Sequence, residues 1–202
     1  MSKTEEIIYG LRTIVNGYST FAIIWHAVFY LLLGALLLRW QPSNKLLSLA
    51  ICLPVISVDV FAWLSGNPFN GLLFSVFTVL IIIFGFGASN QPIQTSQLVF
   101  VIIGILMIVF GLVYPHFINA DSFLKYLYAS PVGLIPCPTL SILIGFLLLY
   151  NGFGSQSLIL TFVAFGLFYG LFGVLKLAVY LDIFLVFGTI TLLVKYVLSL
   201  RA

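Results

Sequence analysis

Apolar runs separated by short polar breaks repeat along almost the whole chain. A helix needs about 20 consecutive apolar residues to cross the hydrocarbon core of a bilayer, and seven runs reach or approach that length. They cover about 18–38, 46–65, 69–87, 97–114, 137–151, 156–174 and 177–198. The fifth is short and the last two are nearly continuous, so six spans is the alternative count. The pattern predicts an all-α, polytopic integral membrane protein, with all 202 residues in one bundle of about seven transmembrane helices.

Two segments outside the apolar runs are more than turns. Residues 1–17 carry Ile7, Leu11 and Ile14 at helical spacing among charged side chains, which favours an amphipathic helix lying in the membrane interface. A frayed polar lead-in fits the same residues equally well. Residues 115–136 are a long aromatic-rich loop with room for a short interfacial helix. A loop of this length in a compact protein is more often functional than filler.

Composition strengthens the membrane assignment and excludes other classes of protein. Hydrophobic residues make up 62% of the chain and charged residues 6%, against roughly 25% charged in an ordinary soluble domain. The net charge is only +3, and the basic residues stand at the ends of the apolar runs. This argues for the lipid bilayer, and against nucleic acid, as a partner. We expect an inner (plasma) membrane protein, and a small excess of basic residues on the carboxyl-terminal side favours a cytoplasmic carboxyl terminus.

Ionisable residues gather in the half of the bundle nearest the amino terminus. If successive spans alternate in direction, His26 lies roughly 12 Å deep in the first span and Asp59 roughly 9 Å deep in the second. Charged side chains inside a membrane are costly, so such residues are functional candidates by default. We expect Asp59, which shares a stripe with Trp63, to accept a hydrogen bond from His26 or Tyr30. The pair could handle a proton or bind a cation, or it could simply hold two helices together.

The sequence Pro136-Cys137-Pro138-Thr139 opens the fifth run. Proline suits the first turn of a helix, so Cys137 would lie at a helix N-terminus, where the dipole and free N–H groups favour a thiolate. This fits a soft-metal or redox site, and it fits equally a rigid helix start with a small filler residue. Cys137, Asp59 and His26 are weak candidates for metal ligands, because no third ligand stands near them in the sequence.

Gly166 and Gly170 form a small-xxx-small pair in the sixth run. Such pairs let two helix backbones approach closely. The pair predicts close packing, either within the chain or between two copies in a homo-oligomer.

Three stretches resemble a family of small bacterial multi-pass membrane proteins that is a domain of unknown function. They are YSTFAIIWHAVFYLLL, FAWLSGNPFNGLLFSVFTVL and the segment from YP to GLIPCPTLSILIGFLLL. The shared pattern is Tyr18 with Trp25 in the first span, Asn67-Pro68 between two spans, and Pro136 to Thr139. The chain departs from it at His26, where the family pattern has proline, so the resemblance gives His26 no role. It implies the seven-span fold and draws attention to Cys137, and it implies no activity.

Three functions fit these observations. The first is a small transport, permeation or ion-binding protein for a small solute or cation, with a polar vestibule on the amino-terminal side. The predicted lining residues are His26, Tyr30, Asp59, Trp63 and Cys137. The second is a structural or accessory subunit of a membrane complex, and the third is a membrane thiol (redox) protein centred on Cys137. The sequence contains no recognisable nucleophile–base spacing or phosphate loop, so we assign no catalytic residue and no cofactor.

Overall fold

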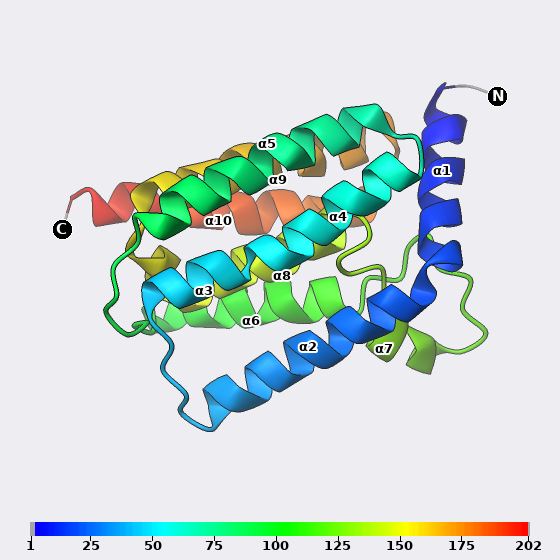
Figure 1. Ribbon diagram of the computed structural model, residues 1–202. Helices are drawn as coiled ribbons and strands as arrows, with labels where there is room; N and C mark the ends of the chain where they lie inside the picture. The colour runs from blue at the N-terminus through cyan, green and yellow to red at the C-terminus, as the bar shows by residue number, and fades with distance from the viewer. Residues whose placement is uncertain (1–2, 202) are drawn as a thin grey trace.

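The computed structural model describes residues 3–201, and within them the chain forms helices and no strands. The helices are α1 (Lys3–Gly17), α2 (Ser19–Leu37), α3 (Asn44–Ala50), α4 (Cys52–Leu64), α5 (Pro68–Phe86), α6 (Leu98–Leu112), α7 (Tyr126–Ala129), α8 (Pro136–Leu149), α9 (Gln156–Lys176) and α10 (Ile183–Ser199). Short 3₁₀ turns are η1 (Phe123–Lys125), η2 (Asn151–Gly154) and η3 (Tyr180–Asp182). The long helices run roughly along one axis, α1 lies across one end of them, and the termini lie at opposite ends (Figure 1). The predicted all-helical class is confirmed.

Five helical stretches are long and apolar enough to cross a membrane. They are Ser19–Leu37, Asn44–Leu64, Pro68–Phe86, Gln156–Lys176 and Tyr180–Ser199. The second of them breaks at Ile51, between α3 and α4, because Pro54 has no N–H to donate to the carbonyl one turn earlier. α6 and α8 are apolar but have only 15 and 14 residues. The predicted count of seven spans is therefore not confirmed.

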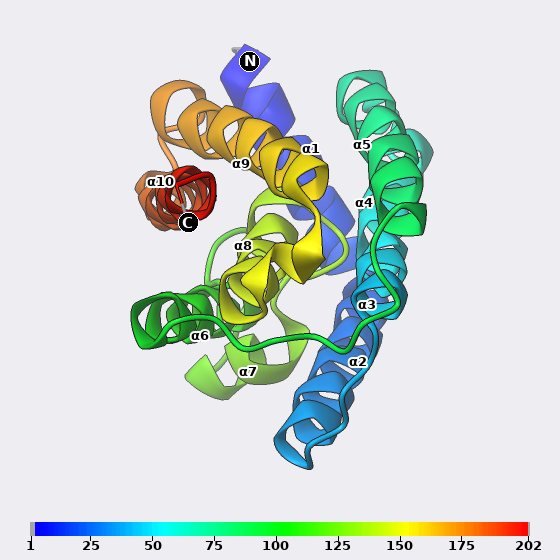
Figure 2. The same ribbon diagram turned by 90° about the vertical axis from the view of Figure 1, so that its left-hand side faces the viewer.

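α8 occupies the centre of the bundle. All its residues from Pro138 to Leu148 are buried, and α4, α6, α9 and α10 lie around it (Figure 2). Glycines bring it against α6, since a Cβ on Gly104 would lie 2.7 Å from the carbonyl oxygen of Gly145. A Cβ on Gly111 would likewise lie 2.6 Å from the carbonyl oxygen of Pro138. Such backbone contact between membrane helices depends on small residues, and here it encloses α8 in protein.

The chain enters α8 through a buried, non-helical segment, residues 130–135. Thr139 satisfies two backbone groups there, because its hydroxyl accepts from the Gly133 N–H and donates to the Ile135 carbonyl, both at 2.8 Å. Gly133 has a φ of +72°, and the Trp25 ring fills the space that a side chain would need. Irregular backbone at membrane depth is tolerated only inside protein or beside a water-filled cavity. The predicted loop therefore has a buried part as well as an exposed one, and the exposed part holds the expected short helix.

α1 is amphipathic, as its sequence predicts. Leu11 and Ile14 are buried against the end of the bundle, and the opposite side of the helix is exposed. Asn16 fastens α1 to the following loop, because its amide donates to the Phe117 carbonyl at 3.0 Å and accepts from the Asn119 N–H at 2.9 Å. The first two residues of the predicted segment 1–17 lie outside the described part of the chain.

The glycine pair on α9 packs within the chain. A Cβ on Gly166 would lie 2.4 Å from the Thr189 hydroxyl, and one on Gly170 would lie 2.7 Å from Val186 Cγ2, both on α10. This face of α9 is therefore already covered by α10, and it does not offer the contact between two copies that the sequence also allowed.

Candidate functional site

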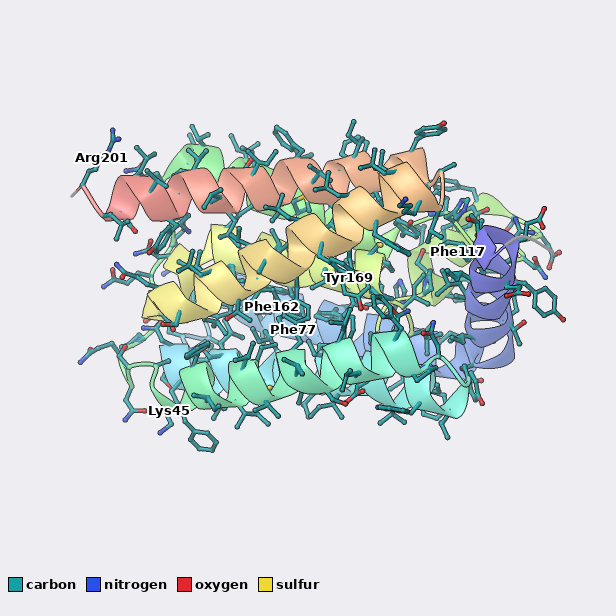
Figure 3. All side chains as sticks on the ribbon, turned by 90° about the horizontal axis from the view of Figure 1, so that it is seen from above. Lys45, Phe77, Phe117, Phe162, Tyr169 and Arg201 are labelled. Atoms are coloured by element: carbon teal, nitrogen blue, oxygen red, sulfur yellow. The ribbon has the colours of Figure 1, made fainter. Side chains whose placement is uncertain are left out.

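A pocket of about 330 Å³ lies beneath α1. It forms where α5 and α9 diverge: the two helices meet at Phe77 and Phe162, whose ring centroids are 4.9 Å apart, and separate towards α1 (Figure 3). α1, α5 and α9 supply the apolar walls, which include Leu11, Phe69 and Phe172. The polar groups of the lining are Asn67, Asn70, Cys137, Tyr169 and Asp182. The pocket is thus mostly apolar with a few convergent polar side chains, the usual character of a small-molecule site.

Asp182 is the one charged side chain of this lining. It is only 1% exposed, and its two oxygens accept from the Tyr114 hydroxyl at 2.8 Å and from Cys137 Sγ at 3.1 Å. Gly173 on α9 makes room for it, because a Cβ there would lie 1.9 Å from Asp182 Oδ2. The segment after α6 and the starts of α8 and α10 therefore meet at this carboxylate, and both of its hydrogen-bond donors are uncharged.

The Asp182 carboxylate lies beside the N-terminus of α8 and makes no capping hydrogen bond to α10. Cys137 is in the first turn of α8, and Asp182 itself directly precedes α10. The positive end of a helix dipole favours a carboxylate. The first turn of α8 also contains Pro136 and Pro138, which have no N–H. This end of α8 therefore supplies a favourable field but few hydrogen-bond donors.

Tyr169 and Asn70 form a second polar contact in the pocket. The Tyr169 hydroxyl on α9 donates to Asn70 Oδ1 on α5 at 3.1 Å. This bond links the diverging helices where they form the pocket walls. It leaves the amide nitrogen of Asn70 as a further donor for a ligand.

His26 and Tyr30 lie elsewhere, at the contact of α2 with the loop region after α6. His26 is buried, and its Nδ1 and Nε2 lie 2.8 Å and 2.9 Å from the carbonyl oxygens of Ala22 and Leu112. The Tyr30 hydroxyl donates to the Leu127 carbonyl. These contacts fasten α2 to the end of α6 and to α7.

Asp59 and Trp63 form a third group, between α4 and α5. The Ser75 hydroxyl contacts both Asp59 carboxylate oxygens, at 3.0 Å and 2.9 Å, and Trp63 Nε1 donates to the Ser75 oxygen at 3.3 Å. The expected bond between Asp59 and His26 or Tyr30 is therefore wrong. α2 meets α4 through Trp25 and Ser57, whose Nε1 and Oγ are 2.9 Å apart.

The residues predicted to line a polar vestibule lie in three separate places. Of the five predicted residues, only Cys137 lines the pocket. Within residues 3–201, no three His, Cys, Asp or Glu side chains come together to hold a metal ion, so Cys137, Asp59 and His26 are not a joint ligand set. The expected thiolate is also disfavoured, because Cys137 donates a hydrogen bond to a carboxylate whose negative charge would repel it.

Lys195, one of the basic residues near the ends of the apolar runs, is buried and joins α10 to the end of α8. It is 6% exposed and donates to the carbonyls of Leu147 and Leu148, at 3.0 Å and 2.9 Å, and to the Ser96 hydroxyl at 2.6 Å. It thus caps the C-terminus of α8. A smaller polar hollow of about 200 Å³ lies at the same end of the protein, with Asn44 in its lining. The half of the bundle nearest the carboxyl terminus therefore contains more buried polar contacts than its sequence suggests. The sequence feature that indicates them is a lysine inside the last apolar run.

His116 lies in the loop near α1 and is half-buried. Burial lowers its pKa, and the positive charge of Arg12 lowers it further. The folded loop therefore favours the uncharged imidazole of His116 around neutral pH.

Comparisons with protein-family models, curated proteins and solved structures found no match.

Proposed function

We propose that this protein binds a small amphipathic solute inside the membrane and serves its transport or permeation. The observation that carries the proposal is the pocket of about 330 Å³ beneath α1, where apolar walls lead to Asp182 and Cys137. Ligand pockets begin near 300 Å³ and combine a mostly apolar lining with a few polar groups. In many transporters such sites form where a broken helix exposes polar groups at membrane depth. The irregular segment 130–135 before α8 supports the same interpretation.

We further propose that α6 and α8 also cross the membrane, which gives seven crossings. α8 is about 21 Å long, shorter than a hydrocarbon core of about 30 Å. The buried segment 130–135 before it is folded in turns and keeps the chain inside protein, and a bilayer can thin locally around a short span. An odd number of crossings agrees with termini at opposite ends of the bundle (Figure 1). We also propose an inner membrane location, and the distribution of basic residues supports a cytoplasmic carboxyl terminus.

A pair of variants on α1 tests the binding site. Ile7 lines the pocket, whereas Tyr9 is 66% exposed on the same helix. We expect Ile7→Trp to fill the pocket and Tyr9→Trp to leave it open. Benzyl alcohol is a suitable neutral probe, and its binding to protein in lipid nanodiscs can be followed by ligand-observed NMR, with empty nanodiscs as the partition blank. Saturable binding that Ile7→Trp abolishes and Tyr9→Trp preserves would support the proposal.

The alternative is a structural or accessory subunit whose polar residues only hold helices together. It predicts no saturable binding, or binding that Ile7→Trp leaves unchanged. The contacts of His26, Asp59 and Lys195 suit such a role, because each joins two or more helices. Once a ligand is found, its uptake into proteoliposomes, lost in Ile7→Trp, would separate transport from binding alone. The resemblance to the bacterial multi-pass family fits either function.

A further inference from the structure

We propose that the pocket beneath α1 selects organic cations, that is, protonated or quaternary amines with an apolar body, over neutral and anionic molecules of the same size. This inference rests on the proposed binding function and adds the chemical class of the ligand. Three features of the pocket carry it: an uncompensated carboxylate, a shortage of donors for an anion, and aromatic walls.

The carboxylate of Asp182 has unused capacity for a cationic partner. A carboxylate offers about four acceptor positions, and Tyr114 and Cys137 occupy one on each oxygen. Both donors are neutral, so they orient the group without cancelling its charge. An ionisable side chain inside a membrane bundle normally has a partner of opposite charge. An ammonium group reaching Asp182 from the pocket would supply that partner.

The same end of the pocket is unsuited to an anion. Anions bind at helix N-termini through free N–H groups, and Pro136 and Pro138 remove two of these from the first turn of α8. An anionic ligand would also meet the negative charge of Asp182. A divalent metal ion is equally disfavoured, because it takes several carboxylate or imidazole ligands, and the lining supplies one carboxylate.

The walls suit the body of an amine. Phe69, Phe172 and Tyr169 line the pocket between α5 and α9, and aromatic rings attract cations through their π faces as well as covering apolar surface. The amide of Asn70, held by Tyr169 at 3.1 Å, offers an additional hydrogen bond at the side of the cavity. The ligand expected is therefore small, with one positive charge and an apolar or aromatic body.

Three probes of nearly equal size test this preference: benzylammonium, benzyl alcohol and benzoate. We would measure the binding of each at pH 7 to wild-type protein, Asp182→Asn and Asp59→Asn in nanodiscs, and subtract binding to empty nanodiscs. Asp59→Asn is the matched control, because Asp59 lies on α4 and hydrogen bonds to Ser75 away from the pocket. A hydrogen bond to a charged group corresponds to about a tenfold gain in affinity or more.

We expect benzylammonium to bind the wild type about tenfold or more tightly than benzyl alcohol, and benzoate not to bind measurably. Asp182→Asn should remove the advantage of the amine and keep the binding of benzyl alcohol, while Asp59→Asn should behave as the wild type. Equal binding of amine and alcohol by the wild type would overturn the cation preference and leave the binding function standing. Absence of saturable binding by all three probes would overturn both. The wild-type ratio decides the question even where Asp182→Asn fails to fold.

Discussion

Replacing Gly104 by alanine tests whether α6 and α8 are in backbone contact. The new Cβ would lie 2.7 Å from the Gly145 carbonyl oxygen and 3.0 Å from the Leu149 nitrogen, whereas ordinary contacts begin near 3.4 Å. Both neighbours are backbone atoms that cannot rotate away, so the helices must separate by roughly 0.7 Å at this point. Overpacking of this kind costs about 1–3 kcal/mol, and the better helix propensity of alanine offsets about 1 kcal/mol of it. We expect a net loss of up to about 2 kcal/mol in the free energy of unfolding, which is about 1–3 kcal/mol below a variant that has only the propensity gain.

Gly34→Ala is the matched control. It makes the same exchange in the apolar helix α2, where nothing lies within 4 Å of the new Cβ. Only the propensity gain of up to about 1 kcal/mol then remains, so this variant should be as stable as the wild type or more stable. Unfolding in mixed micelles with increasing SDS, followed by far-UV circular dichroism, gives the two free energies. If Gly104→Ala matched Gly34→Ala, the close contact of α6 with α8, and with it the enclosed position of α8, would be refuted.

Lys195, His116 and Cys137 each give a further test. Lys195→Met removes three hydrogen bonds near the end of α8. At about 0.6 kcal/mol for each bond, the free energy of unfolding in the same SDS assay should fall by about 2 kcal/mol. Lys176→Met, at the exposed end of α9, is the control, and an equal loss in both variants would contradict the capping role. Because its folded pKa is lowered from 6.5, His116 opposes protonation of the folded state, so stability should fall as pH drops below about 6.5. Thermal unfolding at pH 7.5 and 5.5 should show a smaller fall for His116→Asn, and an unchanged fall would place the pH dependence elsewhere. Cys137 should resist labelling by N-ethylmaleimide in folded protein, because its thiol donates a hydrogen bond to Asp182, and it should react after unfolding. Peptide mass spectrometry measures the labelling. Fast labelling of folded protein would favour the thiol function instead.

The positions of the helices could be predicted from the sequence, and their rotations could not. Hydropathy located the third run at 69–87, against Pro68–Phe86 in the structure, because a membrane helix must have a certain length. Rotation about the axis is readable only from a polar stripe, and these helices are apolar on nearly every side. His26 and Asp59 were expected to match in depth, but α2 and α4 meet through Trp25 with Ser57 and through Phe21 with Phe61. One residue along a helix is a turn of 100°, enough to direct His26 to α6.

The candidate site could be predicted in part for the same reason. Asp182 and Cys137 were each recognisable, one as an acidic residue inside an apolar run and the other between two prolines. Their contact depends on α8 and α10 being neighbours, and an order of apolar runs does not determine which helices are adjacent. Tyr114, just beyond the end of α6, and Gly173, which gives the carboxylate its space, carry no local signal that separates them from other aromatic and small residues.

The position of Asp182 gives it a role in the fold as well as in the pocket. α10 runs parallel to α8 and meets both its ends, with Asp182 beside Cys137 in the first turn and Lys195 on the carbonyls of Leu147 and Leu148 in the last. A carboxylate at the positive end of a helix dipole and an ammonium at the negative end are each stabilising, by up to about 2 kcal/mol when partly buried. α8 contacts little but protein, and its dipole is therefore balanced by charged side chains of one neighbouring helix, α10, and the residue that precedes it. A carboxylate held in this way can stay charged in an empty pocket, which is the condition for binding a cation there. Loss of stability in Asp182→Asn is consequently expected under every function, and only the ratio of amine to alcohol binding distinguishes a site from a structural contact.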